Sequence, residues 1–381
     1  LRLISFENSG GSFGIKQAIM PMIILTCLAS RLSNKQVVWV EDRMEHLTAA
    51  SSATGRLTKI KASIDDQGTI HALDYDQIDD VGAYPRAPEP ASLYRMHGNL
   101  SGAYKVKNIR CRNRVILTNK TPSGLNRGFG GPQHYFALER LVYQIAVELK
   151  LNVLDVIKIN LLEKNQFPYK SPSGALLDSG NFQKLVKKVI ESSTYKKILK
   201  NKNNSIKNGK IYGIGYSAII EPSISNMGYV TTALPYQDRE KTGHKGGALA
   251  STSVSIGPTG SIYVTCDSLP QGQGHETILS QIVADVFRVK LNEIFVNSTH
   301  DTHKDSWSIA AGNYSSRFAG AVAGSAYNAA INLKKKLQKI AASELNCKSE
   351  NVLFDKGKVF DKKNSDNYLT VSYTHLTLPT R

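Results

Sequence analysis

Arg127 lies among glycines in the run Pro122–Tyr135, PSGLNRGFGGPQHY. Glycine lets a backbone turn sharply and approach a ligand closely. A helix-like pattern follows at once, and the first turn of a helix directs free N–H groups back toward the loop, where they can bind an anion such as phosphate. A tight turn that only precedes a helix explains the same residues equally well, because glycine-rich loops are common. The run therefore predicts either an anion-binding loop or a plain turn.

The same arrangement occurs four times: a strand-like run, a loop of Gly, Ser, Gln or Asn, and then a helix-like run. The four loops are Gly10–Gly14, Gly124–Gly131, Gln271–Thr277 and Gly312–Arg317. Backbone amides and amide side chains from several such loops suit one large polar ligand that carries phosphates. Four unrelated turns are the alternative interpretation of these residues taken alone.

Patterns of apolar and β-branched residues predict the elements that would position these loops. Helices are expected at residues 15–32, 133–150, 153–163, 278–287 and 318–345. Strands are expected at 1–8, 36–42, 113–120, 209–220 and 293–302, and hairpins at 57–84 and 248–268. A lysine-rich run at 184–210, typical of a solvated helix and linker, separates the two halves. The helix at 133–150 is expected to bury one apolar face, made of Phe136, Leu141, Val142, Ile145 and Leu149.

The net charge of +17 is in the range of nucleic-acid-binding proteins. However, the lysine-rich run holds nine of the lysines and has no arginine and one aromatic residue, Tyr195, so we expect no nucleic-acid partner. The four cysteines are far apart in sequence, which excludes cysteine-rich metal and disulfide motifs and is typical of a reducing compartment. No signal peptide opens the chain, and the apolar run Ala18–Leu28 is too short to cross a bilayer. We expect a cytoplasmic protein without a membrane span.

Five stretches carry a resemblance to a known family: GGSFGIK followed by VVWVEDRMEHL, NRGFGGPQ, FPYKSPSGALLDSGNF, QGQGHETILSQIVAD and GNYSSR. In order and spacing they resemble the molybdenum-binding large subunit of the xanthine dehydrogenase, aldehyde oxidase and carbon monoxide dehydrogenase family. The resemblance implies an α+β fold class with two mixed α/β molybdopterin-binding domains, truncated at both ends. The expected boundaries are 1–180 for the first domain, 181–210 for the lysine-rich helix and linker, 211–370 for the second domain, and 371–381 for a non-native tail.

The family's cofactor is molybdopterin with molybdenum, here expected as the cytosine dinucleotide. Its own sulfurs hold the metal, so the resemblance implies no protein metal ligand. Phe13 would lie beside the metal, Gln17 would stand at a substrate-determining position, and Arg127 would stabilise negative charge on the substrate oxygen. The residues implied to hold the cofactor are Gly11, Phe13, Gly14, Arg127, Gly128, Phe129, Gln271, Gly272, Gln273, Gly274, His275, Thr277, Gly312, Asn313, Ser315, Ser316 and Arg317. His275, as a lone histidine, is equally well explained as an ordinary hydrogen-bonded side chain.

Two departures from the family pattern narrow the range of expected substrates. Copper-containing carbon monoxide dehydrogenases have a cysteine directly after the arginine, where this chain has Gly128. Xanthine-specific members have a glutamate where this chain has Gln17. The remaining expectation is a hydroxylase of aldehydes or N-heterocycles.

The resemblance implies hydroxylation with water as the oxygen source and electron transfer to an iron–sulfur subunit and an FAD subunit, in a dimer of heterotrimers. The family's general-base glutamate lies outside this chain, so we expect the fragment alone to be inactive. The alternatives are a carbon monoxide dehydrogenase-like protein, a non-catalytic cofactor-binding fragment, and a nucleotide-binding regulatory protein.

Overall fold

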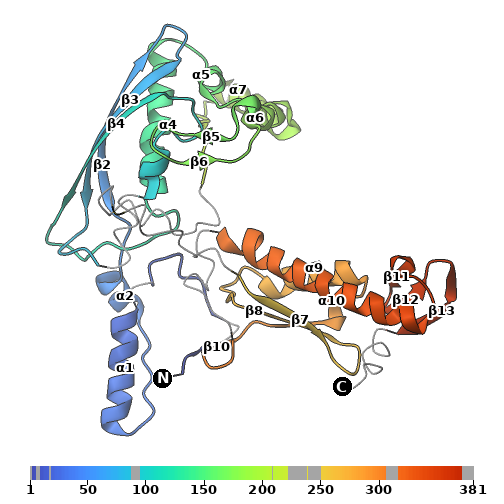
Figure 1. Cartoon of the computed structure of the whole chain (residues 1–381). Coiled ribbons are helices and arrows are strands. Elements are labelled where there is room, and N and C mark those ends of the chain that lie inside the picture. Colours follow the sequence, from blue (N-terminus) through green and yellow to red (C-terminus); the bar gives the residue numbers. More distant parts are fainter. Residues whose placement is uncertain are drawn as a thin grey trace. The chain divides into compact units, whose positions relative to one another are not determined.

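The computed structural model describes residues 2–5, 9–16, 19–86, 95–207, 209–221, 238, 250–305 and 316–370. The chain divides into two compact units, each described here by itself. The described residues of Ser12–Glu221 form the N-terminal unit, and those of Leu1–Gly11 and Tyr236–Arg381 form the C-terminal unit (Figure 1). Both units mix helices and strands, as the predicted fold class requires.

A three-stranded sheet and one long helix form the core of the N-terminal unit. β2 (Gly55–Ile64) and β3 (Ile70–Asp80) pair antiparallel, which confirms the predicted hairpin, and β4 (Asn108–Ile116) pairs parallel with β3. Alternate side chains of β3, such as Leu73 and Tyr75, are buried in one core with α4 (Gly131–Glu148). The sheet therefore has one apolar face, which α4 covers.

The other elements of the N-terminal unit are short or lie at its surface. They are α1 (Met20–Ser33), α2 (Arg43–Ala49), η1 (Arg95–Asn99), α5 (Val153–Asn160), η2 (Lys164–Gln166), β5 (Tyr169–Lys170), β6 (Leu176–Leu177), α6 (Phe182–Glu191) and α7 (Ser193–Lys207). The lysine-rich run, which was predicted to be a helix and a linker, forms two helices, α6 and α7. α1 begins later than predicted, because Pro21 occupies its first turn, where proline is favoured.

Three predictions about the N-terminal unit are wrong. Residues 36–42 form no strand: they are extended, with Val38 73% and Val40 79% exposed, and Asp42 caps α2 instead. Residues 209–220 also form no strand, because side chains rather than a backbone ladder hold them. Phe136 is 78% exposed, since the buried stripe of α4 passes through Tyr135 and Leu138, one residue away. β-branched content alone makes a strand only where a partner strand is present.

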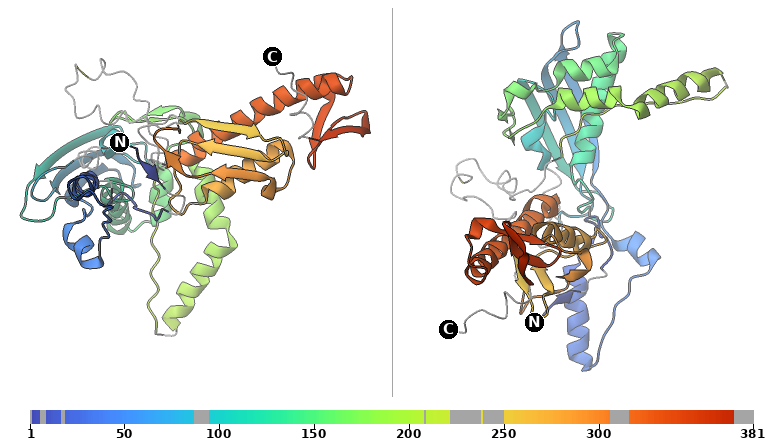
Figure 2. Two further views of the ribbon diagram at one scale, coloured as in Figure 1. Left: turned by 90° about the horizontal axis from the view of Figure 1, so that it is seen from below. Right: turned by 90° about the vertical axis from the view of Figure 1, so that its right-hand side faces the viewer.

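In the C-terminal unit, two helices cover one face of a sheet with the order β7–β8–β9 (Figure 2). β7 (Thr252–Ile256) and β8 (Ile262–Cys266) form the predicted hairpin, and β9 (Ile294–Asn297) is parallel to β8. α9 (His275–Phe287) connects β8 to β9, and α10 (Ala323–Glu344) follows the π-helical turn η7 (Phe318–Val322). Strands β8 and β9 therefore end at the same edge of the sheet, close to the start of α9.

The remaining elements of this unit are η5 (Leu291–Glu293), η8 (Ser349–Asn351) and the three-stranded sheet of β11 (Val352–Asp355), β12 (Lys358–Asp361) and β13 (Asn364–Thr370). The first strand of the chain, β1 (Ile4–Ser5), pairs antiparallel with β10 (His300–Asp301). Of the strand predicted at 1–8, residues 2–5 are described, and β1 is the part of them that forms a strand. None of the described helices combines the length and apolar character that a membrane crossing needs.

Candidate functional site

The loops that carry Phe13 and Arg127 pack against each other in the N-terminal unit. The guanidinium carbon of Arg127 lies 6.0 Å from the centroid of the Phe13 ring, which is 62% exposed. Gly14 has a φ of 102°, and a Cβ placed on it would lie 3.0 Å from the carbonyl oxygen of Leu125. Only glycine suits this conformation and this close approach. The structure thus brings together two residues that the sequence predicted for one site.

The backbone of the arginine loop is set by two glycines in the left-handed region, Gly128 and Gly130, with φ of 86° and 87°. The N–H of Phe129 donates to the carbonyl of Asn126 at 2.7 Å, and the N–H of Gly131 donates to that of Gly128 at 2.8 Å. α4 then begins without a side-chain cap. The loop therefore turns twice in a few residues and points its arginine outward.

A layer of buried polar groups lies between the sheet and the first turn of α4. Arg56 donates to both carboxylate oxygens of Asp79, at 2.6 and 2.9 Å, and Asn113 donates to the same carboxylate at 2.9 Å. Burial, Arg56 and His97 together lower the pKa of His134 to about 3, so this ring is neutral near pH 7. The sequence analysis missed this layer, although polar residues at inward positions of a strand were its signal.

Farther along α4, a mostly buried carboxylate holds the segment that leads out of the unit. Glu139 accepts hydrogen bonds from the Tyr104 hydroxyl at 3.0 and 2.9 Å and from the N–H of Ala218 at 2.9 Å. The Tyr135 hydroxyl donates to the carbonyl of Ile220. Burial raises the pKa of Glu139 to about 7, although the hydrogen bonds from Ala218 and Tyr104 lower the pKa. Glu139 thus titrates near neutral pH.

In the C-terminal unit, hydrogen-bond donors gather where β8 and β9 end. Ser268 and Ser298 follow these strands, are 2% and 3% exposed, and their hydroxyls have no partner in the described part of the chain. Gly272 and Gly274 both have positive φ, and a Cβ placed on either would meet nothing within 4 Å. α9 starts directly after Gly274 without a side-chain cap. The uncapped helix start and the two hydroxyls are the kinds of donor that an anionic ligand can use.

The predicted residues of the amide-rich loop take different positions. The side-chain oxygen of Gln273 accepts a hydrogen bond from the backbone N–H of Gln271. The side-chain NH₂ group of Gln273 therefore points away from this bond. Thr277 is exposed in the first turn of α9. His275 is 1% exposed, and its ring stacks on Phe318 with centroids 3.9 Å apart. The helix starts at His275, three residues earlier than predicted, so His275 and Thr277 belong to the helix rather than to the loop.

The last predicted loop is described only from Ser316 onward. Ser316 is exposed with a φ of 53°, and Arg317 is 1% exposed and donates to Asp267 at 2.7 Å. The ion pair connects the end of β8 to the start of η7. Four predicted residues lie outside the described residues: Gln17, Gly312, Asn313 and Ser315.

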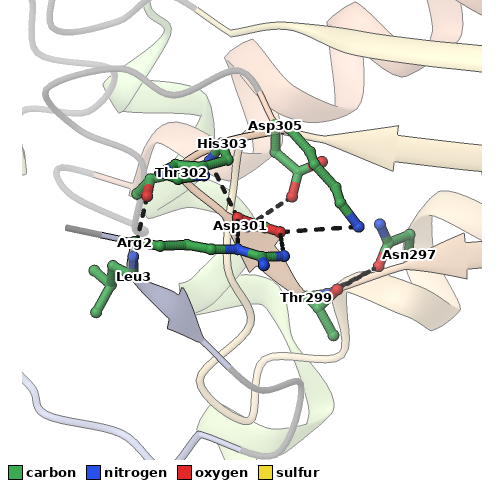
Figure 3. Close-up of polar contacts among 9 residues, drawn as sticks. Arg2, Leu3, Asn297, Thr299, Asp301, Thr302, His303 and Asp305 are labelled. Carbon is green, nitrogen blue, oxygen red and sulfur yellow. Dashed lines mark hydrogen bonds and ion pairs between the residues drawn. The ribbon is translucent and has the colours of Figure 1, made fainter.

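The described residues at the start of the chain are held within the C-terminal unit. Arg2 and Asp301 form a two-pronged ion pair, and Leu3 and Thr302 exchange hydrogen bonds (Figure 3). Arg2 is the main reason that the pKa of Asp301 stands well below its usual range. Gly11 is the last residue of this segment to belong to the C-terminal unit.

Chemically, the two units offer different groups. The N-terminal unit presents an exposed arginine beside an aromatic ring, which can stabilise negative charge next to an apolar surface. The C-terminal unit presents amides and hydroxyls, which suit phosphate or a polar heterocycle. In the described part of the chain, no three His, Cys, Asp or Glu side chains are grouped so that they could hold a metal ion.

Comparisons with known proteins show the family of this chain. The profile for the family described as "Molybdopterin cofactor-binding domain" matches residues 1–161, and a second profile with the same description matches residues 188–377. The nicotine 6-hydroxylase large subunit of Paenarthrobacter nicotinovorans is 28% identical over 353 residues, which are 92% of this chain and 42% of that protein. The carbon monoxide dehydrogenase large chain of Afipia carboxidovorans is 28% identical over 345 residues, 88% of this chain and 41% of that one.

Among solved structures, quinoline 2-oxidoreductase from Pseudomonas putida 86 matches with a TM-score of 0.82 and 26% identity, over 98% of this chain and 47% of that one. The chain therefore spans less than half the length of these relatives. The two profile matches together cover most of the chain, and the fold agrees along nearly all of it. The chain belongs to the molybdopterin-binding large subunits of the xanthine dehydrogenase, aldehyde oxidase and carbon monoxide dehydrogenase family.

Proposed function

We propose that this chain is part of the catalytic large subunit of a molybdenum hydroxylase that oxidises an N-heterocycle or an aldehyde with water as the oxygen source. The family's cofactor is molybdopterin with molybdenum. The observation that carries the proposal is the edge of the C-terminal sheet. Two buried hydroxyls there have no partner among the described residues, and α9 starts there without a side-chain cap.

The groups at this edge fit such a cofactor. Ser268 and Ser298 can each donate a hydrogen bond that no described residue accepts. Gly272 and Gly274 leave space for a ligand to approach the backbone. Glu276, in the first turn of α9, carries a negative charge, so the phosphates are expected nearer the serines than this side chain. We propose that the cofactor is the cytosine dinucleotide form and that these residues bind it together with Gln271, Gln273 and Ser316.

The proposed role of the N-terminal unit is to orient the substrate. When bound, the cofactor supplies the redox chemistry by accepting two electrons from the substrate carbon. The guanidinium of Arg127 would hold the substrate's oxygen or ring nitrogen and stabilise the negative charge that develops there. The Phe13 ring, 6.0 Å from that guanidinium, would provide an apolar wall that orients a flat substrate. No residue of this chain is proposed as the general base, and we propose that the chain alone does not turn over.

The choice of substrate rests on two positions and on the names of relatives. Nicotine 6-hydroxylase and quinoline 2-oxidoreductase are named for N-heterocycles, which favours such a substrate here. A carbon monoxide dehydrogenase-like activity is the second candidate, because two relatives carry that name. Gly128 provides no thiolate beside Arg127, and this disfavours the carbon monoxide dehydrogenase-like activity. Gln17 provides no carboxylate for a purine, which disfavours xanthine.

We further propose a cytoplasmic complex in which iron–sulfur and FAD subunits receive the electrons, assembled as a dimer of heterotrimers. Relatives named as large or gamma subunits of enzyme complexes support the existence of partner subunits. We also propose the domain division at residues 181–210; the two profile matches leave a gap at residues 162–187, which overlaps the start of this range.

The test is cofactor analysis and turnover of the full-length protein purified with its partners. We expect about one molybdenum and one pterin dinucleotide per large subunit, and oxidation of an N-heterocycle such as quinoline with ¹⁸O incorporated from labelled water. Absence of both molybdenum and pterin would refute the proposal. Oxidation of carbon monoxide instead of the heterocycles and aldehydes would favour the second candidate.

A further inference from the structure

Helix α1 of the N-terminal unit exposes its apolar side chains and partly covers the side that carries its polar ones. Ile24 is 57% exposed and Leu25 is 60% exposed, and no residue of the helix is buried. The partly covered residues are Met22, Thr26 and Ser30, which follow one another at intervals of four and therefore share one side. A surface helix of a folded protein normally has the opposite arrangement, with its apolar residues toward the core.

The apolar surface extends more than halfway around α1. Ile23, Ile24 and Leu25 are consecutive, and consecutive residues of a helix point about 100° apart, so these three span about 200°. Leu28 and Leu32 follow Ile24 at intervals of four and extend the surface along the helix axis; they are 47% and 77% exposed. These five side chains are named the α1 surface here. A helix that packs on one flat partner needs an apolar stripe of only about 100°, so the α1 surface needs cover from more than one side.

The N-terminal unit itself does not provide this cover. No other described helix or strand of the unit packs extensively against α1. The extended residues 36–42, which follow the helix, also expose apolar side chains, among them Val38 and Val40. Contiguous exposed apolar surface of this kind marks a site where other protein surface packs.

The lengths of the relatives indicate what covers the α1 surface. This chain spans 42% of the nicotine 6-hydroxylase large subunit and 47% of the quinoline 2-oxidoreductase chain, so more than half of each polypeptide lies outside the matched region. The matched region includes α1, because the first family profile covers residues 1–161 and the structural match covers 98% of this chain. The helix thus belongs to a fold that these relatives build together with additional chain.

The composition of α1 favours a permanent cover. Arg31 is the only charged residue of the helix. Permanent interfaces are more apolar than interfaces between proteins that bind and separate, and resemble the core of one folded domain. An apolar surface that needs cover from more than one side therefore fits the interior of a single folded subunit better than a transient contact.

We propose that a segment of the same large subunit, outside residues 1–381, covers the α1 surface, so that α1 is an interior helix of the complete subunit. The inference rests on the proposed function only in taking this chain as part of a longer large subunit. It does not depend on the cofactor or on the substrate. Its test therefore measures the cover of α1 and not turnover, and wild-type enzyme without pterin would refute the proposed chemistry while leaving this inference intact.

Cys27 is a native probe of the cover, because it is a free and exposed thiol on α1, one turn before Arg31. Its alkylation by iodoacetamide is followed by mass spectrometry in the full-length large subunit, purified alone and with its partner subunits. The matched control is Lys200→Cys, which places a thiol at an exposed position of the lysine-rich helix α7. We expect Cys27 of the subunit alone to react at least about a hundredfold more slowly than the control thiol, because a covered group reacts only when the structure opens locally.

Photocrosslinking from position 31 identifies what covers the helix. Arg31 is replaced by a lysine derivative that carries a diazirine, the full-length complex is irradiated, and the crosslinked peptides are sequenced by mass spectrometry. We expect crosslinks to peptides of the large subunit outside residues 1–381. Crosslinks to residues 1–381, whether of the same chain or of a second copy, or to an iron–sulfur or FAD subunit would overturn the inference. Protection of Cys27 that appears only when partner subunits are present would overturn it as well.

Substitutions at two leucines of similar exposure test whether the α1 surface itself is responsible. Leu25→Glu should raise the alkylation rate of Cys27 in the full-length subunit at least about tenfold, because it places a charge in an apolar interface. Leu185→Glu changes a residue of α6 that is 63% exposed, against 60% for Leu25, and should leave the rate within about twofold of the wild type. Leu25→Ala is measured beside them in case Leu25→Glu does not fold, and should also raise the rate at least about tenfold. Wild-type Cys27 as reactive as the control thiol, or equal effects at Leu25 and Leu185, would overturn the inference.

Discussion

Glu139 gives the most direct test of the packing around the arginine loop. It lies on α4, the helix that begins at that loop, and it accepts hydrogen bonds from Tyr104 and from Ala218. Burial raises its pKa from the ordinary 4.5 to about 7. The folded protein therefore binds this proton more tightly than the unfolded chain does. The stability that the proton contributes is complete below pH 4.5 and is lost as the pH rises through 7.

The size of the effect follows from the two pKa values. The free energy of unfolding should be roughly 3 kcal/mol lower at pH 8 than at pH 4.5. Each pH unit between the unfolded and folded pKa values of Glu139 contributes about 1.4 kcal/mol to this loss. Glu139→Gln removes the charge but keeps one acceptor, so the variant should lose most of this pH dependence. Below pH 5, where the wild-type carboxyl is protonated, the variant should be about as stable as the wild type, because one amide oxygen can accept from both Tyr104 and Ala218.

Hydrogen exchange of the α4 amides, corrected for intrinsic rates between pH 5 and 8, measures the local opening free energy. We expect this free energy to fall as the pH rises in the wild type and to stay nearly flat in Glu139→Gln. Glu148→Gln, at an exposed position on the same helix, is the control and should follow the wild type. A Glu139→Gln variant with the wild-type pH dependence would show that the carboxylate is not buried as the structure has it.

Three further predictions concern the site and its support. Arg127→Lys keeps the charge but loses the planar fork, so turnover of the full-length enzyme should fall roughly tenfold to a thousandfold, with molybdenum content unchanged. In Gly124→Ala the new Cβ would overlap the Ser51 side chain, so thermal or urea unfolding should show a loss of about 1–3 kcal/mol. Arg317→Met leaves the buried Asp267 carboxylate without this ion pair, so the free energy of unfolding in urea should fall by about 3–5 kcal/mol. Adding Asp267→Leu should restore most of this loss.

Each of these has a matched control and a contrary result. Arg110→Lys, on the exposed face of β4, should leave turnover intact, and full activity in Arg127→Lys would remove the arginine from the proposed mechanism. Gly213→Ala, where a Cβ meets nothing within 4 Å, should be neutral, so an equal effect at both glycines would contradict the steric argument. Breaking the exposed ion pair of Arg114 and Asp76 should lower the free energy of unfolding by at most about 1 kcal/mol. An equally small loss in Arg317→Met would contradict the strength assigned to the buried ion pair with Asp267.

The sequence by itself determined the features that depend on local pattern. The hairpin of β2 and β3 follows from strict alternation around a turn at residues 65–69, and α4, α9 and α10 follow from helical periodicity. The glycine loops before α4 and α9 follow from the residue types that positive φ values require. The five quoted stretches were specific enough to identify the family, because they resemble its pattern in order and spacing.

Only the tertiary structure decided which segments have partners. Residues 36–42 and 209–220 have strand-like composition but no partner strand among the described residues, and a ladder needs two sides. Phe136 and Tyr135 are adjacent aromatic residues, and the direction from which the sheet approaches α4 determines which of them is buried.

The same holds for contacts between residues that are distant in sequence. The ion pairs of Arg317 with Asp267 and of Arg2 with Asp301 join residues 50 and 299 positions apart, and no local pattern encodes them. The raised pKa of Glu139 likewise arises because chain segments on both sides of α4 close over its carboxylate. Pattern indicates which elements can form, whereas strand pairing, burial and ion pairing depend on how the elements pack, because all three are properties of neighbours in space.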